Sequence, residues 1–110
     1  MLFIKKFTFN AFQENTYIIY NETNQAIIID PGMYDVHEFK QFDAFIQSSH
    51  LNPVLLLNTH THLDHVFGNA HVKRTYRISF AFHESDKPVF DASYNVGHLY
   101  GLAFEKSPEP

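Results

Sequence analysis

The feature that most constrains the fold of this chain is an apolar run followed directly by a histidine-rich segment. Residues 54–57 read Val-Leu-Leu-Leu, and residues 59–65 read Thr-His-Thr-His-Leu-Asp-His. A short, continuous apolar run predicts a strand that is buried on both faces, as in a parallel sheet covered by helices. Side chains that follow such a strand lie at its carboxyl end, where α/β folds usually place their functional sites.

The rest of the sequence alternates between strand and helix patterns. Apolar residues alternate over positions 3–9 and predict a half-buried strand. The spacing predicts further strands at 17–20, 26–29 and 78–82, a hairpin turn at 21–24, a helix over 65–76 with Gly68 as its weak point, and a helix start within 84–90 that tolerates Pro88 in its first turn. The 110 residues therefore predict a single α/β domain spanning residues 1–110.

Residues 35–49 carry the clearest helix signals. Asp35 and Glu38 have the spacing of an N-cap and its capping-box partner. Apolar residues at three- and four-residue steps predict one buried stripe, made of Val36, Phe39, Phe42 and Ile46.

The histidine-rich segment has the spacing of a metal site. Alternate side chains of an extended segment point the same way, so His60 and His62 can reach one ion together, with Asp64 nearby. Asp64 and His65 lie where a helix is expected to start, which lets His65 reach a second position. Imidazole and carboxylate ligands suit Zn²⁺, and also Fe or Mn. The simpler alternative is a polar loop that holds three histidines, and four potential ligands in six residues disfavour it.

The other five histidines have weaker claims. His37, His50 and His98 fall on a helix face or in polar loops and are expected to be solvated or structural. His71 and His83 lie closer to the motif and can reach a site, but a structural role is the favoured interpretation for each.

Composition and charge exclude several classes of protein. The chain has no cysteine, which excludes disulfides, thiolate zinc sites and a cysteine nucleophile. A net charge of −4 disfavours a nucleic-acid partner. No apolar run approaches the roughly 18 residues of a membrane span, and the first residues show no secretory pattern. We therefore expect no membrane partner and a cytoplasmic location.

The segment His60-Thr61-His62-Leu63-Asp64-His65 resembles the H-x-H-x-D-H signature of the metallo-β-lactamase superfamily. Glu14-Asn15-Thr16-Tyr17 and Ile29-Asp30-Pro31-Gly32 occur in the same order in glyoxalase II-like hydrolases of that superfamily. Gly68-Asn69 and Leu99-Tyr100-Gly101 also match, so the resemblance covers nearly the whole chain.

The resemblance implies a role for each residue of the motif. His60 and His62 would bind a first metal, and Asp64 and His65 a second, with Zn²⁺ as the expected ion at both positions. A hydroxide between the metals would be the nucleophile, oriented by Asp64 as the catalytic residue. Asp30 would be a carboxylate behind the ligands that steadies their loop. Asp30 before Pro-Gly is equally typical of a plain strand-ending turn.

The resemblance also implies a larger domain of two β/α halves packed as an αββα sandwich. The second half normally brings three more metal ligands, and this chain offers none in the expected Gly-His turn. We therefore expect residues 1–110 to be an N-terminal half, with a mixed sheet and helices on one face. Such a half would need a complementary C-terminal half or, as a less favoured option, a second copy of itself in a homodimer.

The function implied is a metal-dependent hydrolase resembling glyoxalase II-like thioesterases, with a small ester or thioester as substrate. The alternative is a catalytically inactive truncated fragment, or an interaction half that acts only with its complement. A nuclease is disfavoured by the acidic balance, and an exported β-lactamase by the missing signal.

Overall fold

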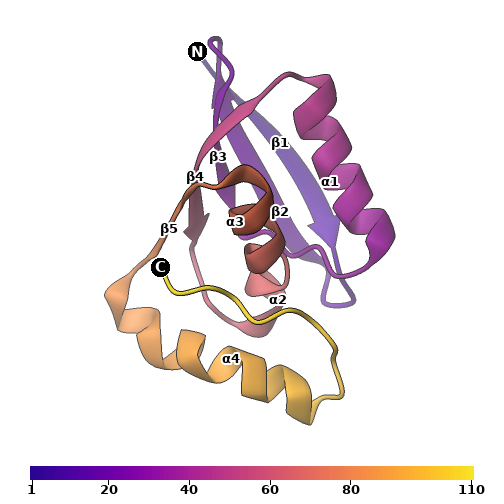
Figure 1. Ribbon diagram of the computed structural model, residues 1–110, viewed down its shortest axis with the longest axis vertical. Helices are drawn as coiled ribbons and strands as arrows, with labels where there is room; N and C mark the ends of the chain where they lie inside the picture. Colours follow the sequence, from indigo (N-terminus) through magenta and orange to yellow (C-terminus); the bar gives the residue numbers. More distant parts are fainter.

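The computed structural model describes all 110 residues and contains one five-stranded mixed sheet (Figure 1). The strands lie side by side in chain order, β1-β2-β3-β4-β5. The first three strands are antiparallel to one another, whereas β4 runs parallel to β3 and β5 parallel to β4. The strands are β1 (Leu2–Phe9), β2 (Glu14–Asn21), β3 (Gln25–Ile29), β4 (Asn52–Asn58) and β5 (Ser79–Phe82).

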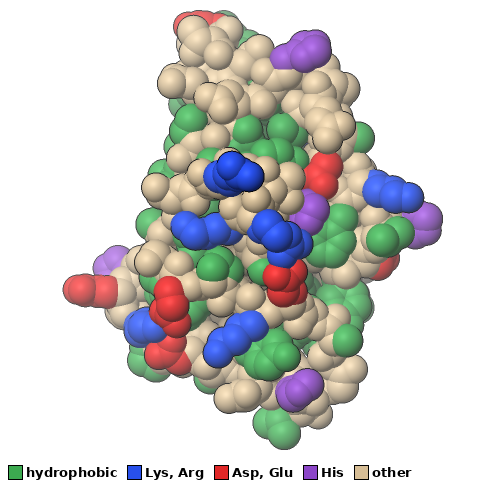
Figure 2. Space-filling view, viewed as in Figure 1, with side chains coloured by type: hydrophobic (Ala, Val, Ile, Leu, Met, Phe, Trp, Pro, Cys, Tyr) green, Lys and Arg blue, Asp and Glu red, His purple; other side chains and the backbone are tan.

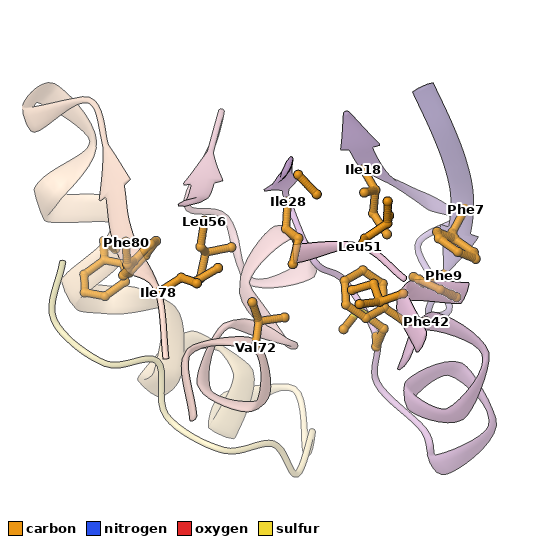
Figure 3. Close-up of a cluster of buried hydrophobic side chains, with 14 residues drawn as sticks. Phe7, Phe9, Ile18, Ile28, Phe42, Leu51, Leu56, Val72, Ile78 and Phe80 are labelled. Carbon is orange, nitrogen blue, oxygen red and sulfur yellow. The ribbon is translucent and has the colours of Figure 1, made fainter. Parts of the chain in front are cut away.

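Two helices, α1 (Val36–Ser48) and α3 (Asn69–Tyr76), cover the same face of this sheet (Figures 1 and 3). The short α2 (Leu63–Val66) and the longer α4 (Lys87–Leu99) lie beyond the end of the sheet toward which β4 points (Figure 1). A single 3₁₀ turn, η1 (Glu84–Asp86), leads into α4. The prediction of an α/β fold with a mixed sheet and helices on one face is confirmed.

The hydrophobic core lies between the sheet and these helices (Figure 3). Direct cross-strand partners form its central row, which runs through four strands as Ile18, Ile28, Leu56 and Phe80. Phe42 of α1 and Val72 of α3 are fully buried over this row. Period-two burial on each strand therefore fixes the sheet's inner face.

The opposite face of the sheet has no helix on it. A second cross-strand row crosses that face through Ile4, Ile19, Ile27 and Leu55. Ile4 is 67% exposed, and its three partners are half-buried. The prediction that residues 54–57 are buried on both faces is therefore wrong for the outer face, because nothing in this chain packs on it.

Helix α1 begins at the predicted N-cap, but Glu38 does not make the predicted capping-box contact. Asp35 caps the helix by accepting a hydrogen bond from the Glu38 backbone N at 2.9 Å. Glu38 does not reach back to Asp35. Its carboxylate accepts from the backbone N of Tyr34 at 2.8 Å and of Asn10 at 2.7 Å, which ties the β1–β2 loop to the helix. Val36, predicted to belong to the buried stripe, is 61% exposed in the first turn.

The predicted helix over 65–76 is broken at its predicted weak point. Gly68 separates α2 from α3, and its backbone N donates to the carbonyl of Pro31 at 2.8 Å. A Cβ at Gly68 would lie 2.8 Å from that same carbonyl oxygen, so only glycine allows this close approach. The break therefore ties the segment after the histidines to the loop after β3. The later helix starts as expected, with Pro88 in the first turn of α4.

The surface and the helix lengths add two observations. On the face shown in Figure 2, Lys and Arg side chains are mixed with Asp, Glu and hydrophobic side chains and form no single basic area. No helix of the structure has the length and apolar character that crossing a membrane requires.

Candidate metal centre

The candidate site lies at the carboxyl ends of β3 and β4. Because these strands are parallel, the loops that follow them emerge at the same end of the sheet. Asp30 follows β3 directly, and the histidine segment follows β4. The backbone N of Asp30 donates to the carbonyl of Leu57 at 2.9 Å, which continues the ladder to the point where both loops leave.

Asp30 fastens the start of the histidine segment. It is 4% exposed, and its Oδ1 accepts a hydrogen bond from the backbone N of Thr59 at 2.7 Å. Its Oδ2 accepts from the Thr59 hydroxyl. Asp30 also has a left-handed φ of 52°, so it turns the chain at the end of β3. The left-handed φ agrees with the turn residue that the sequence allowed, and the role of Asp30 as a carboxylate behind metal ligands stays a prediction.

His65 lies against three carboxyl groups. Its Nδ1 is 3.2 Å from Asp30 Oδ2 and 3.4 Å from Glu14 Oε1, whereas its Nε2 is 3.6 Å from Asp64 Oδ2. Its contact with the Asp30 carboxylate raises the pKa of the imidazole above its usual value, against the effect of burial. The two ring nitrogens therefore have separate surroundings, since Nδ1 faces the buried carboxyl groups of Asp30 and Glu14 and Nε2 faces Asp64.

Glu14 is the buried carboxyl group of this cluster. Desolvation by burial raises the pKa of Glu14 to about 9, so at neutral pH the group is an uncharged acid. Its Oε2 lies 2.9 Å from the hydroxyl oxygen of Thr16. That hydroxyl is also 2.8 Å from the carbonyl oxygen of Asp30 and accepts from the backbone N of Gly32. Since Thr16 has one proton to give and can give it to the carbonyl, a protonated Glu14 supplies the proton for the remaining contact.

The outer histidines lie on an exposed loop with its own anchor. His60 and His62 are exposed, and Thr61 between them is fully buried. The backbone N and the hydroxyl of Thr61 both donate to Asp86 Oδ2, at 2.6 and 2.7 Å. These hydrogen bonds lower the pKa of Asp86. Asp86 therefore holds the peptide that joins the two histidines.

The four predicted ligands lie close together but do not form the tightest group. The ring centroid of His60 is 5.3 Å from that of His65 and 6.1 Å from that of His62. The tightest group is Glu14, Asp30 and His65, which each offer one ligand atom within 4.8 Å of the others. Asp64 joins the cluster through its contact with the His65 ring.

The residues present fit a divalent metal. Their donor atoms are imidazole nitrogens and carboxylate oxygens, which suit Zn²⁺, Fe or Mn. Two buried polar atoms, Glu14 Oε1 and His65 Nδ1, have no hydrogen-bond partner, so the cluster holds polar groups that its own contacts do not satisfy.

Sequence reasoning assigned no role to Glu14 or Asp86. Glu14 lies in a segment that supported the resemblance, but a lone glutamate on a strand carries no sign of burial. Asp86 is 25 positions from Thr61, so its contact is not visible in the local sequence. His71 and His83, the two histidines that lie closer to the motif in sequence, have structural partners. His71 Nε2 is 2.7 Å from Asp43, and His83 accepts from the Ser85 backbone N as the cap of η1.

Comparison with known proteins identifies the family. The family model described as the metallo-β-lactamase superfamily matches residues 9–97. This chain belongs to the metallo-β-lactamase superfamily. The resemblance noted from the histidine motif is therefore confirmed.

Two curated relatives illustrate the similarity. The hydroxyacylglutathione hydrolase GloC of Haemophilus influenzae is 33% identical over 93 residues, which are 84% of this chain and 42% of the relative. The probable metallo-hydrolase YqgX of Bacillus subtilis is 31% identical over 98 residues, 87% of this chain and 44% of the relative. The chain thus spans less than half the length of these relatives.

Solved structures agree on the fold. TTHA1623, solved in a di-iron-bound form, has a TM-score of 0.81 and 29% identity, over 96% of this chain and 51% of that one. The B3 metallo-β-lactamase BLEG-1 has a TM-score of 0.80 at 24% identity, over 98% of this chain and 50% of that one, and shows the fold alone. Coverage of about half of each is consistent with the expected N-terminal half.

Proposed function

We propose that this chain supplies the metal-binding half of a hydrolase that acts on a small ester or thioester. The observation that carries the proposal is the group of three imidazoles and a carboxylate, His60, His62, His65 and Asp64, at the carboxyl ends of two parallel strands. Relatives named hydroxyacylglutathione hydrolase support a thioester as the substrate class.

The ligands divide between two metal positions. His60 and His62 would hold one ion, and Asp64 and His65 the other, with Zn²⁺ as the first expectation and Fe or Mn as options. TTHA1623, which was solved in a di-iron-bound form, supports two metal positions and iron as one possible metal. When bound, such ions supply Lewis acidity that activates water and polarises the carbonyl under attack.

Four carboxyl groups of the chain orient the attacking water or the histidines. Asp64 is proposed as the catalytic residue that orients the attacking water. Asp30 and Glu14 fix the His65 ring through Nδ1, which leaves Nε2 on the side of Asp64. Asp86 keeps His60 and His62 at a constant spacing by holding Thr61.

The uncovered face of the sheet is evidence that a protein partner packs on it. Ile4 and its cross-strand row lie exposed or half-buried there, and an apolar area of this kind is costly in water. The proposed occupant is a complementary C-terminal half, with a second copy of this chain as the alternative. Light scattering combined with metal analysis separates them, because a homodimer scatters as twice 12.8 kDa and a lone chain does not.

Thioester hydrolysis tests the function directly. The purified chain is assayed with Zn²⁺, Mn²⁺ or Fe²⁺, alone and with a C-terminal half taken from a relative such as GloC. Activity that is lost in His62→Ala and kept in His37→Ala supports the hydrolase. No activity with any metal or complement supports the alternative, a catalytically inactive fragment.

A further inference from the structure

The β1–β2 loop reaches the candidate metal centre through one side chain, that of Asn10. Its Nδ2 donates to two backbone carbonyls, that of Gly32 at 2.9 Å and that of Asp64 at 3.0 Å. Its Oδ1 accepts from the backbone N of Phe12 at 2.9 Å, and its own backbone N donates to Glu38 Oε2 at 2.7 Å. Both hydrogens of the amide and its oxygen are therefore engaged, and these partners fix the orientation of the amide.

The turn that carries Asp64 and His65 needs outside contacts because it is short. Helix α2 has four residues, and its N-cap, His62, makes no side-chain hydrogen bond to it. A single helical turn is not stable on its own. Asn58, at the end of β4, donates to the carbonyl of His65 at 3.1 Å. Asn10 donates to the carbonyl of Asp64, so two amides from different parts of the fold hold this turn.

The loop after β3 packs closely against the same carbonyl. A Cβ at Gly32 would lie 2.7 Å from the Asp64 carbonyl oxygen and 2.9 Å from Asn10 Nδ2, so only glycine fits there. The carbonyl oxygens of Gly32 and Asp64 both accept from this one nitrogen. Without the amide, both oxygens would lose a donor, and the turn would lose a link to the loop that follows β3.

We propose that Asn10 is a positioning residue of the metal centre, which fixes the turn of Asp64 and joins it to the β1–β2 loop. The inference rests on the proposed function for the roles of Asp64 and His65 as metal ligands, and on the hydrogen bonds of Asn10 for the link. Phe12 from the loop and His62 and Asp64 from the ligand segment line a common cavity of about 620 Å³. Because Asn10 bonds to the backbone of both Phe12 and Asp64, it also holds the loop beside the ligands.

Zinc affinity and the cobalt spectrum of the full chain test this role. Asn10 has a left-handed φ of 55°, so Asn10→Gly removes the amide without straining the backbone. Asn24→Gly is the matched control, because Asn24 has a φ of 66° in the turn before β3, at the opposite end of that strand from the site. Competition with a chromogenic chelator should show a loss of zinc affinity of about tenfold in Asn10→Gly and none in Asn24→Gly. The visible spectrum of bound Co²⁺, which reports the arrangement of its ligands, should change only in Asn10→Gly.

A second variant covers a failure of the first to fold, which circular dichroism detects. Asn10→Asp keeps the acceptor for the Phe12 backbone N and tolerates the left-handed φ, but it lacks the amide donor. The same change in the Co²⁺ spectrum is expected. A folded Asn10 variant with the wild-type Co²⁺ spectrum would overturn the proposal, whatever its stability.

Thioester hydrolysis, with metal and complement present, separates this inference from the proposed function. A wild-type chain that binds zinc and hydrolyses no thioester, with zinc binding weakened in Asn10→Gly, supports the role of Asn10 and counts against the hydrolase. Equal zinc affinity, Co²⁺ spectrum and kcat in Asn10→Gly and an active wild type count against Asn10 and leave the hydrolase standing.

Discussion

The inner and outer parts of the histidine cluster are built in different ways. His65 lies inside, with Nδ1 within 3.4 Å of two buried carboxyl groups. His60 and His62 lie outside on an exposed loop, and the peptide between them is held by one carboxylate, that of Asp86. The inner histidine contacts buried groups of the fold, whereas the outer pair depends on a contact that spans 25 positions of the chain.

The difference also gives the two parts opposite responses to pH. The inner cluster contains groups with raised pKa values, Glu14 and His65, and the outer anchor Asp86 has a lowered one. The inner part should therefore weaken in base and the outer part in acid. Asp30 contacts both parts, so its replacement should have a larger effect than a change in either part alone.

Replacing Asp30 should have the largest effect, because this residue contacts both His65 and the start of the ligand loop. Asp30→Ala leaves the partly buried backbone N of Thr59 without its acceptor and removes the contact with His65, and we expect the free energy of unfolding to fall by about 2–4 kcal/mol. Urea denaturation of the metal-free chain measures this fall. Asp30→Asn keeps an acceptor oxygen and tolerates a left-handed φ, so it should lose less. Equal stability of Asp30→Ala and the wild type would contradict the role.

Glu14 should make the metal-free chain less stable as the pH rises. Its folded pKa of about 9 lies above the unfolded value of 4.5, so its contribution is complete below pH 4.5 and is lost as the pH rises toward 9. The raised pKa of His65 acts in the same direction above its unfolded value of 6.5. We expect Glu14→Gln to remove on the order of 2 kcal/mol of this fall between pH 5 and 9. Urea denaturation across that range checks it, and an unchanged slope in the variant would refute it.

Asp86→Ala tests the outer part. Loss of the anchor for Thr61 should weaken zinc binding by about tenfold, as is usual when a residue that orients ligands is removed. Competition with a chromogenic chelator measures the affinity, and Asp91→Ala, at an exposed position of α4, is the matched control. Because the folded pKa of Asp86 is lowered, its stabilising effect is present above its unfolded value of 3.8 and is lost as the pH falls through the folded value. Equal zinc affinity in both variants would show that the loop needs no anchor.

The smallest effect is expected at a histidine outside the cluster. His37 is exposed on α1, so His37→Ala should change the free energy of unfolding by less than about 0.5 kcal/mol and leave zinc binding unchanged. The same two titrations measure it. A loss of zinc binding in this variant would mean that the ion is held elsewhere.

The sequence predicts the local parts of this fold and misses the contacts between distant parts. The N-cap at Asp35, the weak point at Gly68 and a helix start within residues 84–90 follow from local backbone chemistry and are correct, although the single helix predicted over 65–76 is two helices. The burial of the outer sheet face was misjudged because an apolar strand has the same sequence pattern whether or not a second layer packs on that face. The short-range motif points to His60, His62, Asp64 and His65, whereas Glu14 and Asp86 reach the site from other strands and turns and carry no local signal.

Zinc titration of three forms of the full chain tests the central claim most directly. Isothermal titration compares the wild type, the triple variant H60A/H62A/H65A, and the matched control H37A/H98A, which removes two exposed histidines. The account predicts zinc binding in the wild type and the control, and its loss in the triple variant, with all three chains folded by circular dichroism. Unchanged zinc binding by a folded triple variant would contradict a metal centre at the ends of β3 and β4.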